Sequence, residues 1–547
     1  MKQASDLFVE CLEREGVEYI FGLPGEESLA LLESIRRSSI KFIVTRHEQA
    51  AAFMAATCGR LTGTAGVVLS TLGPGATNLV TGVAYAQLGG MPLVVVTGQK
   101  PIRKSKQGQF QIINVVQMMQ PITKATRQIV SPDLIPSLVR DSFRRAEDER
   151  PGAVHLEFPE DIASERTDAR ALEKITALRA GPDHSAVETA ARMIEAARHP
   201  VILIAAAANR KKDRAELDEL VTRTGIPFFT TQMGKGVLDE RCECCLGTAA
   251  LMENDFLHRA IERSDLIISI GHDVTEKPPF RMGYGGRSVI HMNFYPAPID
   301  DVYFPAFEVI GDIALSVREL TANIRVSPGW DFSYFRKVIS EFRKHTLEKE
   351  NDPSFPVKPE RFVADLRRTM PDDGILALDN GMFKIWIARN YPAYEQNTVL
   401  LDNALASMGA GLPAAIAAKL INPGKKVVCV SGDGGFMMNS QELETAIRLR
   451  LDLTVVIVND GGYGMIKWKQ DSMRLPSFGL EFGNPDFVEY AGSFGARGYR
   501  VGSAAEFSGI LAGCIGSKGV SIIDLPIDYS DNVKVLTDEL TARTANL

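Results

Sequence analysis

The chain has 547 residues and a formal net charge of -7 at pH 7, with 45% hydrophobic and 24% charged residues. This composition is typical of a soluble globular protein, and it excludes a disordered chain, a collagen-like repeat and a disulfide-stapled miniprotein. The net negative charge argues against nucleic acid or an anionic membrane as a partner, because neither attracts an acidic protein.

The N-terminal residues 1–21 are typical of an amphipathic helix that leads into a strand, and not of a signal peptide. No apolar run reaches the ~18 residues of a membrane span, so we expect a cytoplasmic protein. Seven cysteines are too few for a secreted disulfide framework. Cys242, Cys244 and Cys245 cluster, but a zinc site needs about four ligands. Buried reduced thiols are therefore the expected form of this cluster.

Short β-branched runs recur along the chain, and each is followed by a longer helical pattern. Because the runs lack polar alternation, they are typical of parallel strands buried on both faces of a sheet. The alternation of strand and helix predicts the α/β fold class, with open doubly wound parallel sheets. The expected strands lie at residues 17–21, 41–45, 66–70, 92–98, 153–158, 201–208, 226–231, 265–271, 289–294, 374–379, 426–434, 453–460 and 520–526.

Two polar stretches, residues 160–188 and 326–359, are typical of connectors between domains. The second combines a charged helical pattern with a proline-rich extended end. They predict three α/β domains, an N-terminal domain at 1–170, a central domain at 185–325 and a C-terminal domain at 356–547.

The most informative segment is residues 427–465, in which two predicted strands each end beside an aspartate. The first strand turns through the glycine-rich residues 432–435 into a helix, so that main-chain amides can approach a phosphate. Asp433 can serve that phosphate only through a divalent cation, because like charges repel. Asp460 follows 27 positions later and would lie beside it at the carboxyl ends of neighbouring strands. The alternative is two unrelated loop aspartates.

This pattern resembles the thiamine diphosphate motif, in which GDG is followed further along the chain by two asparagines. Here Asp460 replaces the second asparagine and can still bind magnesium through oxygen. The resemblance implies that Asp433, Asp460 and the main-chain carbonyl of Gly462 are the Mg²⁺ ligands. It implies that the residues holding the diphosphate are Gly381, Met382, Phe383, Gly432, Gly434, Gly435 and Met465.

The same resemblance requires a glutamate at the end of an N-terminal strand, and Glu48 supplies it within residues 46–55, RHEQAAAFMA. In the family this glutamate hydrogen-bonds the aminopyrimidine ring and promotes its imino tautomer, which removes a proton from the thiazolium carbon. The alternative is a helix N-terminal residue that the helix dipole favours. We expect His47 to be a structural histidine.

Further stretches resemble the acetolactate synthase branch of this superfamily and cover nearly the whole chain. The resemblance implies that Met408 wedges between the two cofactor rings and that the Ala406 carbonyl accepts a hydrogen bond from the aminopyrimidine. A core side chain is the alternative for Met408. Gln111 matches a glutamine beside the reaction centre. The stretches are residues 21–25, 70–86, 110–124, 149–162 and 403–418.

The resemblance also implies pyrimidine-binding, central and diphosphate-binding domains, with active sites between the subunits of a homodimer or homotetramer. Residues 381–389, 479–487 and 525–532 resemble the flavin-free catabolic enzymes. Flavin-containing relatives carry a GGG turn where residues 205–209 read AAAAN, and residues 271–280 replace an arginine- and aspartate-rich stretch. Both departures argue against bound FAD.

The implied reaction is a carboligase transfer, in which pyruvate or a related 2-oxo acid is decarboxylated and joined to a second 2-oxo acid. The alternative is a simple decarboxylase that releases an aldehyde, with Glu26 as proton relay. Glu26 and Glu27 also fit an acidic pair at a helix N-terminus. An inactive cofactor-binding paralogue is a third reading. Lys467, Trp468 and Lys469 differ from the usual pocket pattern and suggest a larger or more acidic 2-oxo acid.

Overall fold

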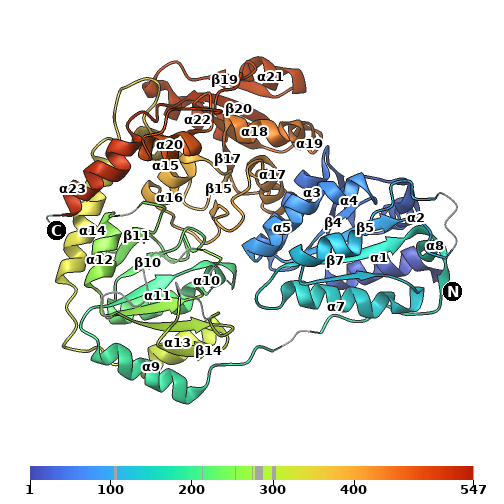
Figure 1. The fold of residues 1–547 in the computed structure, drawn as a ribbon, viewed down its shortest axis with the longest axis horizontal. Helices are drawn as coiled ribbons and strands as arrows, with labels where there is room; N and C mark the ends of the chain where they lie inside the picture. The colour runs from blue at the N-terminus through green and yellow to red at the C-terminus, as the bar shows by residue number, and fades with distance from the viewer. Residues whose placement is uncertain are drawn as a thin grey trace. The chain divides into compact units, whose positions relative to one another are not determined.

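The predicted α/β fold class is confirmed in a computed structural model of the chain (Figure 1). Each of three main sheets has six strands, and the strands of each pair in parallel. None of the described helices is long and apolar enough to cross a membrane. The structure describes residues 1–103, 108–175, 178–211, 213–252, 254–273, 275–276, 287–298, 303–545 and 547.

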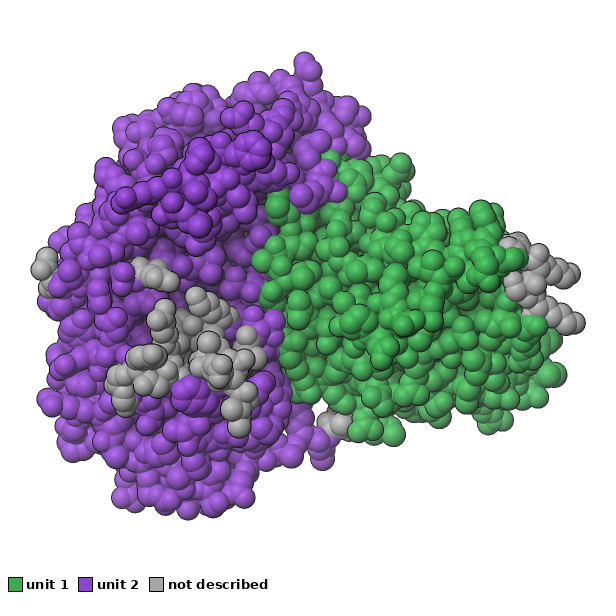
Figure 2. Space-filling view, viewed as in Figure 1, with its two compact units in different colours: residues 1–177, 404–423, 439–451 green, residues 178–403, 424–438, 452–547 purple. Residues whose placement is uncertain are grey.

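The chain folds into two compact units, which Figure 2 shows in green and purple. After residue 403 the chain alternates between them, so the C-terminal part contributes to both. Unit 1 comprises residues 1–177, 404–423 and 439–451, and unit 2 comprises residues 178–403, 424–438 and 452–547.

Unit 1 is built on a sheet with the strand order β3-β2-β4-β5-β7-β6. Helices α1 (Ala4–Glu15), α2 (Leu29–Arg36) and α7 (Ile135–Glu147) share an apolar core with one face, and α3 (Glu48–Thr62) and α5 (Val80–Gly89) pack on the other. The strand order reverses between β2 and β4, so the loops after them meet at the ligand-binding edge. The strands are β2 (Tyr19–Gly22), β3 (Lys41–Val44), β4 (Gly66–Ser70), β5 (Leu93–Gln99), β6 (Ala125–Gln128) and β7 (Ala153–Pro159).

Smaller elements complete unit 1. Its remaining helices and strands are β1 (Lys2–Gln3), which pairs antiparallel with β8 (Arg166–Thr167), α4 (Pro74–Asn78), α6 (Val115–Met119), α8 (Glu160–Ser164), α17 (Gly411–Ile421) and α19 (Leu443–Arg448). Helix α17 packs against α3, although the two are far apart in sequence.

The first sheet of unit 2 has the order β11-β10-β9-β12-β13-β14 and reverses between β9 and β12. Its core is shared with α9, α11 and α13. The strands are β9 (Pro200–Ile204), β10 (Phe228–Thr230), β11 (Cys245–Thr248), β12 (Leu266–Ile270), β13 (Ser288–Asn293) and β14 (Phe307–Ile310). The helices are α9 (His184–Ala196), α10 (Ala206–Lys211), α11 (Arg214–Thr224), α12 (Phe256–Arg263) and α13 (Ile313–Asn323).

The second sheet of unit 2 has the order β16-β15-β17-β18-β20-β19 and reverses between β15 and β17. Its strands are β15 (Ile375–Leu378), β16 (Val399–Leu400), β17 (Val427–Gly432), β18 (Leu453–Asn459), β19 (Arg497–Arg500) and β20 (Val520–Pro526). The helices of this part are α14 (Ser333–Leu347), α15 (Pro359–Thr369), α16 (Met382–Asn390), α18 (Asp433–Asn439), α20 (Gly464–Ser472), α21 (Phe487–Phe494), α22 (Phe507–Gly516) and α23 (Leu540–Thr544).

Every predicted strand is present, but two of the runs extend into the helix that follows. The run at 201–208 ends as a strand at Ile204 and α10 begins at Ala206, while the run at 426–434 ends at Gly432 and α18 begins at Asp433. Alanine is the strongest helix former, so the alanine run continues as helix once the strand leaves the sheet. Seven of the described strands were missed: the two-residue strands β1 and β8, and the edge strands β6, β11, β14, β16 and β19.

Candidate active site

The predicted metal ligands meet at the carboxyl edge of the second sheet of unit 2. β17 ends at Gly432 and α18 begins at Asp433, while the neighbouring β18 ends at Asn459, directly before Asp460. Parallel neighbours end at the same edge of a sheet, so their next residues lie side by side. The main-chain N–H of Gly461 donates to Asp433 Oδ2 at 2.9 Å and ties the two loops together.

Both carboxyl groups are poorly hydrated. Burial raises the pKa of Asp433, although hydrogen bonds from Asn484 and from main-chain N–H groups oppose the rise. Burial, and then the negative charge of Asp433, raise the pKa of Asp460 to about 7. No lysine or arginine of the described residues forms an ion pair with either carboxylate. Two adjacent carboxylates without a protein counter-ion suit Mg²⁺, which binds proteins through one or two carboxylates when it also binds phosphate.

Two polar atoms beside these carboxylates support the same reading. Asn484 Nδ2 donates to Asp433 Oδ2 at 2.7 Å, but the buried Oδ1 of Asn484 has no hydrogen-bond partner in the structure. The buried Tyr529 hydroxyl has none either, and burial with the charges of Asp460 and Asp433 raises its pKa, so it stays protonated. An unused acceptor and an unused donor fit a hydrated cation with a phosphate. Sequence reasoning missed both residues, although they lie in the stretches 479–487 and 525–532 that carry the family resemblance.

The glycine-rich turn meets the predicted 381–383 loop at the point where this sheet reverses. A Cβ on Gly435 would lie 3.0 Å from Asp379 Oδ1, and one on Gly432 would lie 3.4 Å from the Phe383 ring. Met382 and Phe383 are buried at the start of α16. The structure therefore brings these two predicted diphosphate contacts together, and the close approach explains why glycine is needed at Gly435.

The remaining predicted residues of unit 2 lie in and before α20. Gly462 forms an isolated bridge with residue 481, and Met465 is half-buried in the first turn of α20. Lys467 and Lys469 are exposed, whereas Trp468 is buried with its Nε1 unpartnered. Lys469 Nζ lies 4.7 Å from the centre of the Trp468 ring. The two lysines therefore keep their charges at the surface of unit 2.

Glu48 is buried at the first position of α3 in unit 1. Asn78 Nδ2 donates to its Oε2 at 3.0 Å, and a Cβ on Gly75 would lie 3.3 Å from its Oε1. His47 caps the helix, because its Nδ1 accepts from the Gln49 N–H at 3.1 Å, which fits the structural role expected for it. One carboxylate oxygen of Glu48 is thus fixed by an amide, while the other faces a turn that leaves it room.

Asn439 joins the start of α3 to the predicted ring-binding segment. Its Nδ2 donates to Gln49 Oε1 at 3.2 Å and to the Gly409 carbonyl at 2.8 Å. Gly409 directly follows the half-buried Met408, and Ala406 has a φ of 55°, a left-handed conformation that is strained for a residue with a Cβ. The structure therefore brings Met408 and Ala406 into the same unit as Glu48. Sequence reasoning did not find Asn439.

The two glutamates at the start of η1 (Glu26–Ser28) lie in different environments. Glu26 is exposed, whereas Glu27 is buried. Glu27 Oε1 lies 2.5 Å from Lys100 Nζ, and its Oε2 accepts from the Thr71 hydroxyl. Burial alone would raise the pKa of Glu27, but the hydrogen bonds from Lys100 and Thr71 lower it below its usual value. Glu27 is therefore held as a carboxylate.

This ion pair lies close to Glu48 within unit 1. A Cβ on Gly75 would lie 2.8 Å from Thr71 Cγ2 and 3.3 Å from Glu48 Oε1. The loop after β4 therefore lies between the Glu27 and Glu48 carboxylates, with Thr71 bonded to Glu27 and Gly75 next to Glu48. Sequence reasoning weighed only Glu26 as a catalytic acid, because two adjacent glutamates in a sequence do not show which side chain points into the protein.

Gln111 contacts the same loop through its main chain. A Cβ on Gly73 would lie 2.7 Å from the Gln111 carbonyl oxygen, and Gly73 and Gln111 have φ values of 52° and 58°. The Gln111 side chain is exposed. The structure therefore places Gln111 beside the loop that leads to Gly75 and Asn78, with its side chain accessible.

The corresponding edge of the central sheet is filled by the protein itself. The Ala207 N–H, at the start of α10, donates to the Gly271 carbonyl at 3.1 Å, and a Cβ on Gly271 would lie 2.7 Å from the Ala208 nitrogen. A dinucleotide bound at this point of the fold places its diphosphate on the N–H groups at the start of a helix. Here one of these groups, the Ala207 N–H, is already bonded to the protein. Residues 274 and 277–280, from the stretch that departs from the flavin-containing pattern, lie outside the described residues.

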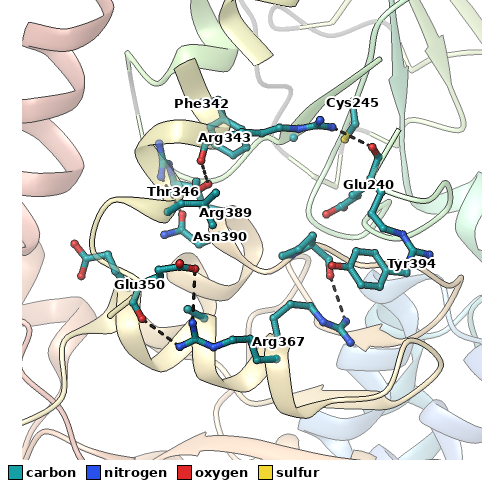
Figure 3. Close-up of a pocket in the computed structure, with 17 residues that line it drawn as sticks. Glu240, Cys245, Phe342, Arg343, Thr346, Glu350, Arg367, Arg389, Asn390 and Tyr394 are labelled. Atoms are coloured by element: carbon teal, nitrogen blue, oxygen red, sulfur yellow. Dashed lines mark hydrogen bonds and ion pairs between the residues drawn. The ribbon is translucent and has the colours of Figure 1, made fainter. Parts of the chain in front are cut away.

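A separate cavity of about 420 Å³ lies in unit 2 and is lined by none of the predicted site residues (Figure 3). Several arginines line it, and most of them form ion pairs with protein carboxylates. Arg389 makes two hydrogen bonds to Asp255, at 2.7 and 2.8 Å, and Arg368 donates to Asp365 at 2.6 Å. We assign this cavity no part in the candidate active site.

Three family models together match most of the chain. Residues 2–118 match the thiamine pyrophosphate enzyme N-terminal TPP binding domain, residues 187–320 its central domain, and residues 379–525 its C-terminal TPP binding domain.

Individual proteins are similar over nearly the whole length. The chain is 34% identical to an acetolactate synthase of Bacillus subtilis (strain 168), over 98% of this chain and 95% of that protein. It is 34% identical to a catabolic acetolactate synthase of Raoultella terrigena, over 96% and 95%. It is 32% identical to a probable acetolactate synthase large subunit of Methanocaldococcus jannaschii, over 97% and 92%.

We expect the affinity for Mn²⁺, a probe that takes similar oxygen ligands, to fall as the pH is lowered through about 7. The metal binds ionised Asp460, so protons compete with it below the raised pKa, and affinity falls by about tenfold per pH unit well below that value. Titration followed by electron paramagnetic resonance, without thiamine diphosphate, measures this. Asp460→Asn restores the asparagine of the family pattern, so it should still bind through its amide oxygen but lose most of the pH dependence near 7. A constant wild-type affinity across this range contradicts the assignment.

Proposed function

Because the chain belongs to the acetolactate synthase family of thiamine pyrophosphate enzymes, we propose that it uses thiamine diphosphate and Mg²⁺ to decarboxylate pyruvate, or a related 2-oxo acid, and to ligate the product to a second 2-oxo acid. The observation that carries the proposal is the pair Asp433 and Asp460, two adjacent carboxylates with raised pKa values beside a glycine-rich helix start. The unpartnered Asn484 Oδ1 and Tyr529 hydroxyl beside the pair also support this proposal over a structural pair of aspartates.

When bound, thiamine diphosphate supplies a carbon nucleophile and an electron sink for decarboxylation. Asp433, Asp460 and the Gly462 carbonyl would hold Mg²⁺, and the N–H groups at the start of α18 would bind the diphosphate. Glu48 would exchange a proton with the aminopyrimidine through Oε1, while Asn78 holds Oε2 in place. Ala406 would accept a hydrogen bond from the same ring, and Met408, Gly381 and Met465 would contact the cofactor.

The choice between ligation and aldehyde release depends on whether a protein acid protonates the reacting carbon before the second 2-oxo acid attacks. Glu27 lies near Glu48 but is held ionised by Lys100 and Thr71, so it has no proton to give. Glu26 is exposed in its unit. These observations support the synthase over the simple decarboxylase, which stays the alternative with Glu26 as its relay.

Two exposed cations of α20 bear on the choice of substrate. Lys467 and Lys469 follow the segment that carries the proposed Mg²⁺ ligands, and Lys467 Nζ lies 3.2 Å from Asp471 Oδ2. Lys469 is the cation that supports a 2-oxo acid with a second carboxylate, so acidic 2-oxo acids belong among the candidate substrates.

Incubation with thiamine diphosphate, Mg²⁺ and pyruvate, or an acidic 2-oxo acid, should yield acetolactate or the matching ligation product. Glu48→Gln is the matched control. It should bind the cofactor normally and lose about 10²–10⁴-fold in turnover, the usual contribution of a positioned acid or base. Product chromatography distinguishes the readings, since aldehyde alone favours the decarboxylase and no turnover of any 2-oxo acid favours the inactive paralogue. Full activity of Glu48→Gln refutes the role of Glu48.

Flavin is not part of the proposed chemistry. The Ala207 and Gly271 main chains bond to each other where a dinucleotide would bind, which supports the flavin-free reading. We expect purified protein to lack the visible absorbance of flavin and to have the same activity with and without added FAD. Bound flavin that is required for turnover would overturn this proposal.

The proposal assigns residues 1–170 to pyrimidine binding, 185–325 to the central domain and 356–547 to diphosphate binding, with active sites between the subunits of a homodimer or homotetramer. Large apolar side chains that are exposed in the single chain support subunit contacts near α18 and α20. They are Met437, Met438, Ile466, Met473, Leu475 and Phe478. A cytoplasmic location remains our expectation.

Mixing two inactive variants tests the shared site. We expect Glu48→Gln and Asp433→Asn each to be inactive, and their mixture, after subunit exchange, to regain part of the wild-type activity. A mixed dimer has one site in which Glu48 and Asp433 are both intact if the two residues of a site come from different subunits. Activity that never returns, although exchange is shown by mass spectrometry of labelled subunits, means that each site is built from one chain.

A further inference from the structure

The cysteine cluster before β11 differs from the expectation of buried thiols. All seven cysteines lie within the described residues, and five of them, including Cys245, are buried. Cys242 and Cys244 are partly exposed. The only two accessible cysteines are thus two positions apart, and the prediction of buried thiols was wrong for both. The turn that carries them leads into β11 and reaches the surface before the strand enters the sheet.

The local geometry brings the two thiols together. The Cys245 N–H donates to the Cys242 carbonyl at 3.1 Å, which closes a turn around Cys244. The Cys244 N–H donates to Cys242 Sγ at 3.4 Å, so the sulfur of Cys242 already lies over the main chain of Cys244. Two Cα steps of about 3.8 Å, bent at a turn, fall within the separation of about 4.4–6.8 Å that a disulfide requires.

Helix α14 holds this turn in place from the side of the cavity in Figure 3. Arg343 Nη2 donates to the Cys242 carbonyl at 2.7 Å, and the figure shows Arg343 reaching from α14 toward the strand that carries Cys245. The backbone at Cys242 is therefore fixed while its side chain stays accessible. The turn therefore holds the two cysteines close together at the surface of unit 2.

The two thiols also differ in reactivity. A hydrogen bond from the Cys244 thiol lowers the pKa of Cys242, and the positive charge of Arg343 acts in the same direction against burial. Burial raises the pKa of Cys245 to about 12, so that thiol stays protonated and unreactive. The thiolate is the nucleophile in thiol–disulfide exchange. The hydrogen bond to Cys242, and then burial, raise the pKa of Cys244, so Cys242 is suited to attack first. Once Cys242 is in a mixed disulfide its thiolate no longer accepts this hydrogen bond, and Cys244 is then suited to complete the exchange.

We propose that Cys242 and Cys244 are a redox-active dithiol that small disulfides, such as glutathione disulfide, convert into a disulfide within the turn. The Cys242 thiolate attacks one sulfur of glutathione disulfide, forms a mixed disulfide and releases one glutathione thiolate. Cys244 then loses its proton and attacks the Cys242 sulfur, which expels the second glutathione. The two protein thiols lose two electrons and two protons, and one glutathione disulfide becomes two glutathione molecules.

This site is independent of the proposed carboligase. None of the residues predicted to bind cofactor or metal lies in the turn. A disulfide that closes so small a ring at a partly exposed position is readily reduced, because strained and exposed disulfides have high reduction potentials. The modification is therefore expected to be reversible by dithiothreitol.

Mass spectrometry of the intact, folded protein tests the proposal. Reduced protein is treated with glutathione disulfide, unfolded in iodoacetamide and digested with trypsin, which releases the peptide 242–259. We expect this peptide to carry one carbamidomethyl group, on Cys245, and one internal disulfide, while the peptides of the other four cysteines are fully alkylated. Dithiothreitol added before alkylation should give three carbamidomethyl groups on the peptide.

Single variants assign the two roles. Cys244→Ser should accumulate a glutathione adduct on Cys242, because no second thiol completes the exchange, and Cys242→Ser should form neither adduct nor disulfide at an appreciable rate. Cys245→Ala is the matched control and should still form the disulfide. Circular dichroism of each variant before treatment confirms the fold. Alkylation of all three cysteines after glutathione disulfide treatment, or a disulfide that disappears in Cys245→Ala, overturns the proposal.

Discussion

The repulsion between Asp433 and Asp460 is the interaction on which the proposed metal site depends. A rise in the pKa of Asp460 from 3.8 to about 7 corresponds to a cost on the order of 4 kcal/mol for keeping it ionised at neutral pH. Main-chain N–H groups and Asn484 stabilise Asp433, whereas the cause that opposes the rise at Asp460 is a hydrogen bond from its own main-chain N–H. A divalent cation would remove this cost, which supports the proposed metal site.

Sheet topology brings these groups together, and the three sheets use it differently. In each of the three main sheets the chain winds in opposite directions from one pair of neighbouring strands, β2 and β4, β9 and β12, or β15 and β17, and the loops after these strands lie at the carboxyl edge. In unit 1 the loops after β2 and β4 hold Glu27 and Thr71, and in the second sheet of unit 2 those after β15 and β17 hold Asp379 and Asp433. In the central sheet Ala207 and Gly271 close the same point with a main-chain hydrogen bond. The same topology thus supplies the residues proposed to bind the cofactor in two sheets, and a main-chain contact of the protein itself in the third.

The sequence predicted the buried strands and the residues next to them, because a strand covered on both faces is a continuous apolar run. It missed β6, β11, β14, β16 and β19, which are edge strands, short or partly polar, with a hydrogen-bonded neighbour on one side only. The motif aspartates were found because each follows a buried strand. Asn439 and Glu442 were missed for a different reason: they bond to the start of α3 from about 390 residues away in the sequence, and no local pattern marks such a contact.

The ion pair of Glu27 and Lys100 contributes little to the stability of the fold but fixes the charge of Glu27. Burying two charges costs about as much as their attraction returns, so apolar side chains of similar size would serve stability equally well. Apolar side chains would not provide a carboxylate that is fixed in its ionised form. Thr71 bonds to this carboxylate, and Glu48 lies beside the same turn. Lys100 keeps this carboxyl from being a proton source, because the ion pair and the hydrogen bond from Thr71 lower the pKa of Glu27. The charge of Lys100 therefore supports the proposed ligation, in which no protein acid should compete with the second 2-oxo acid.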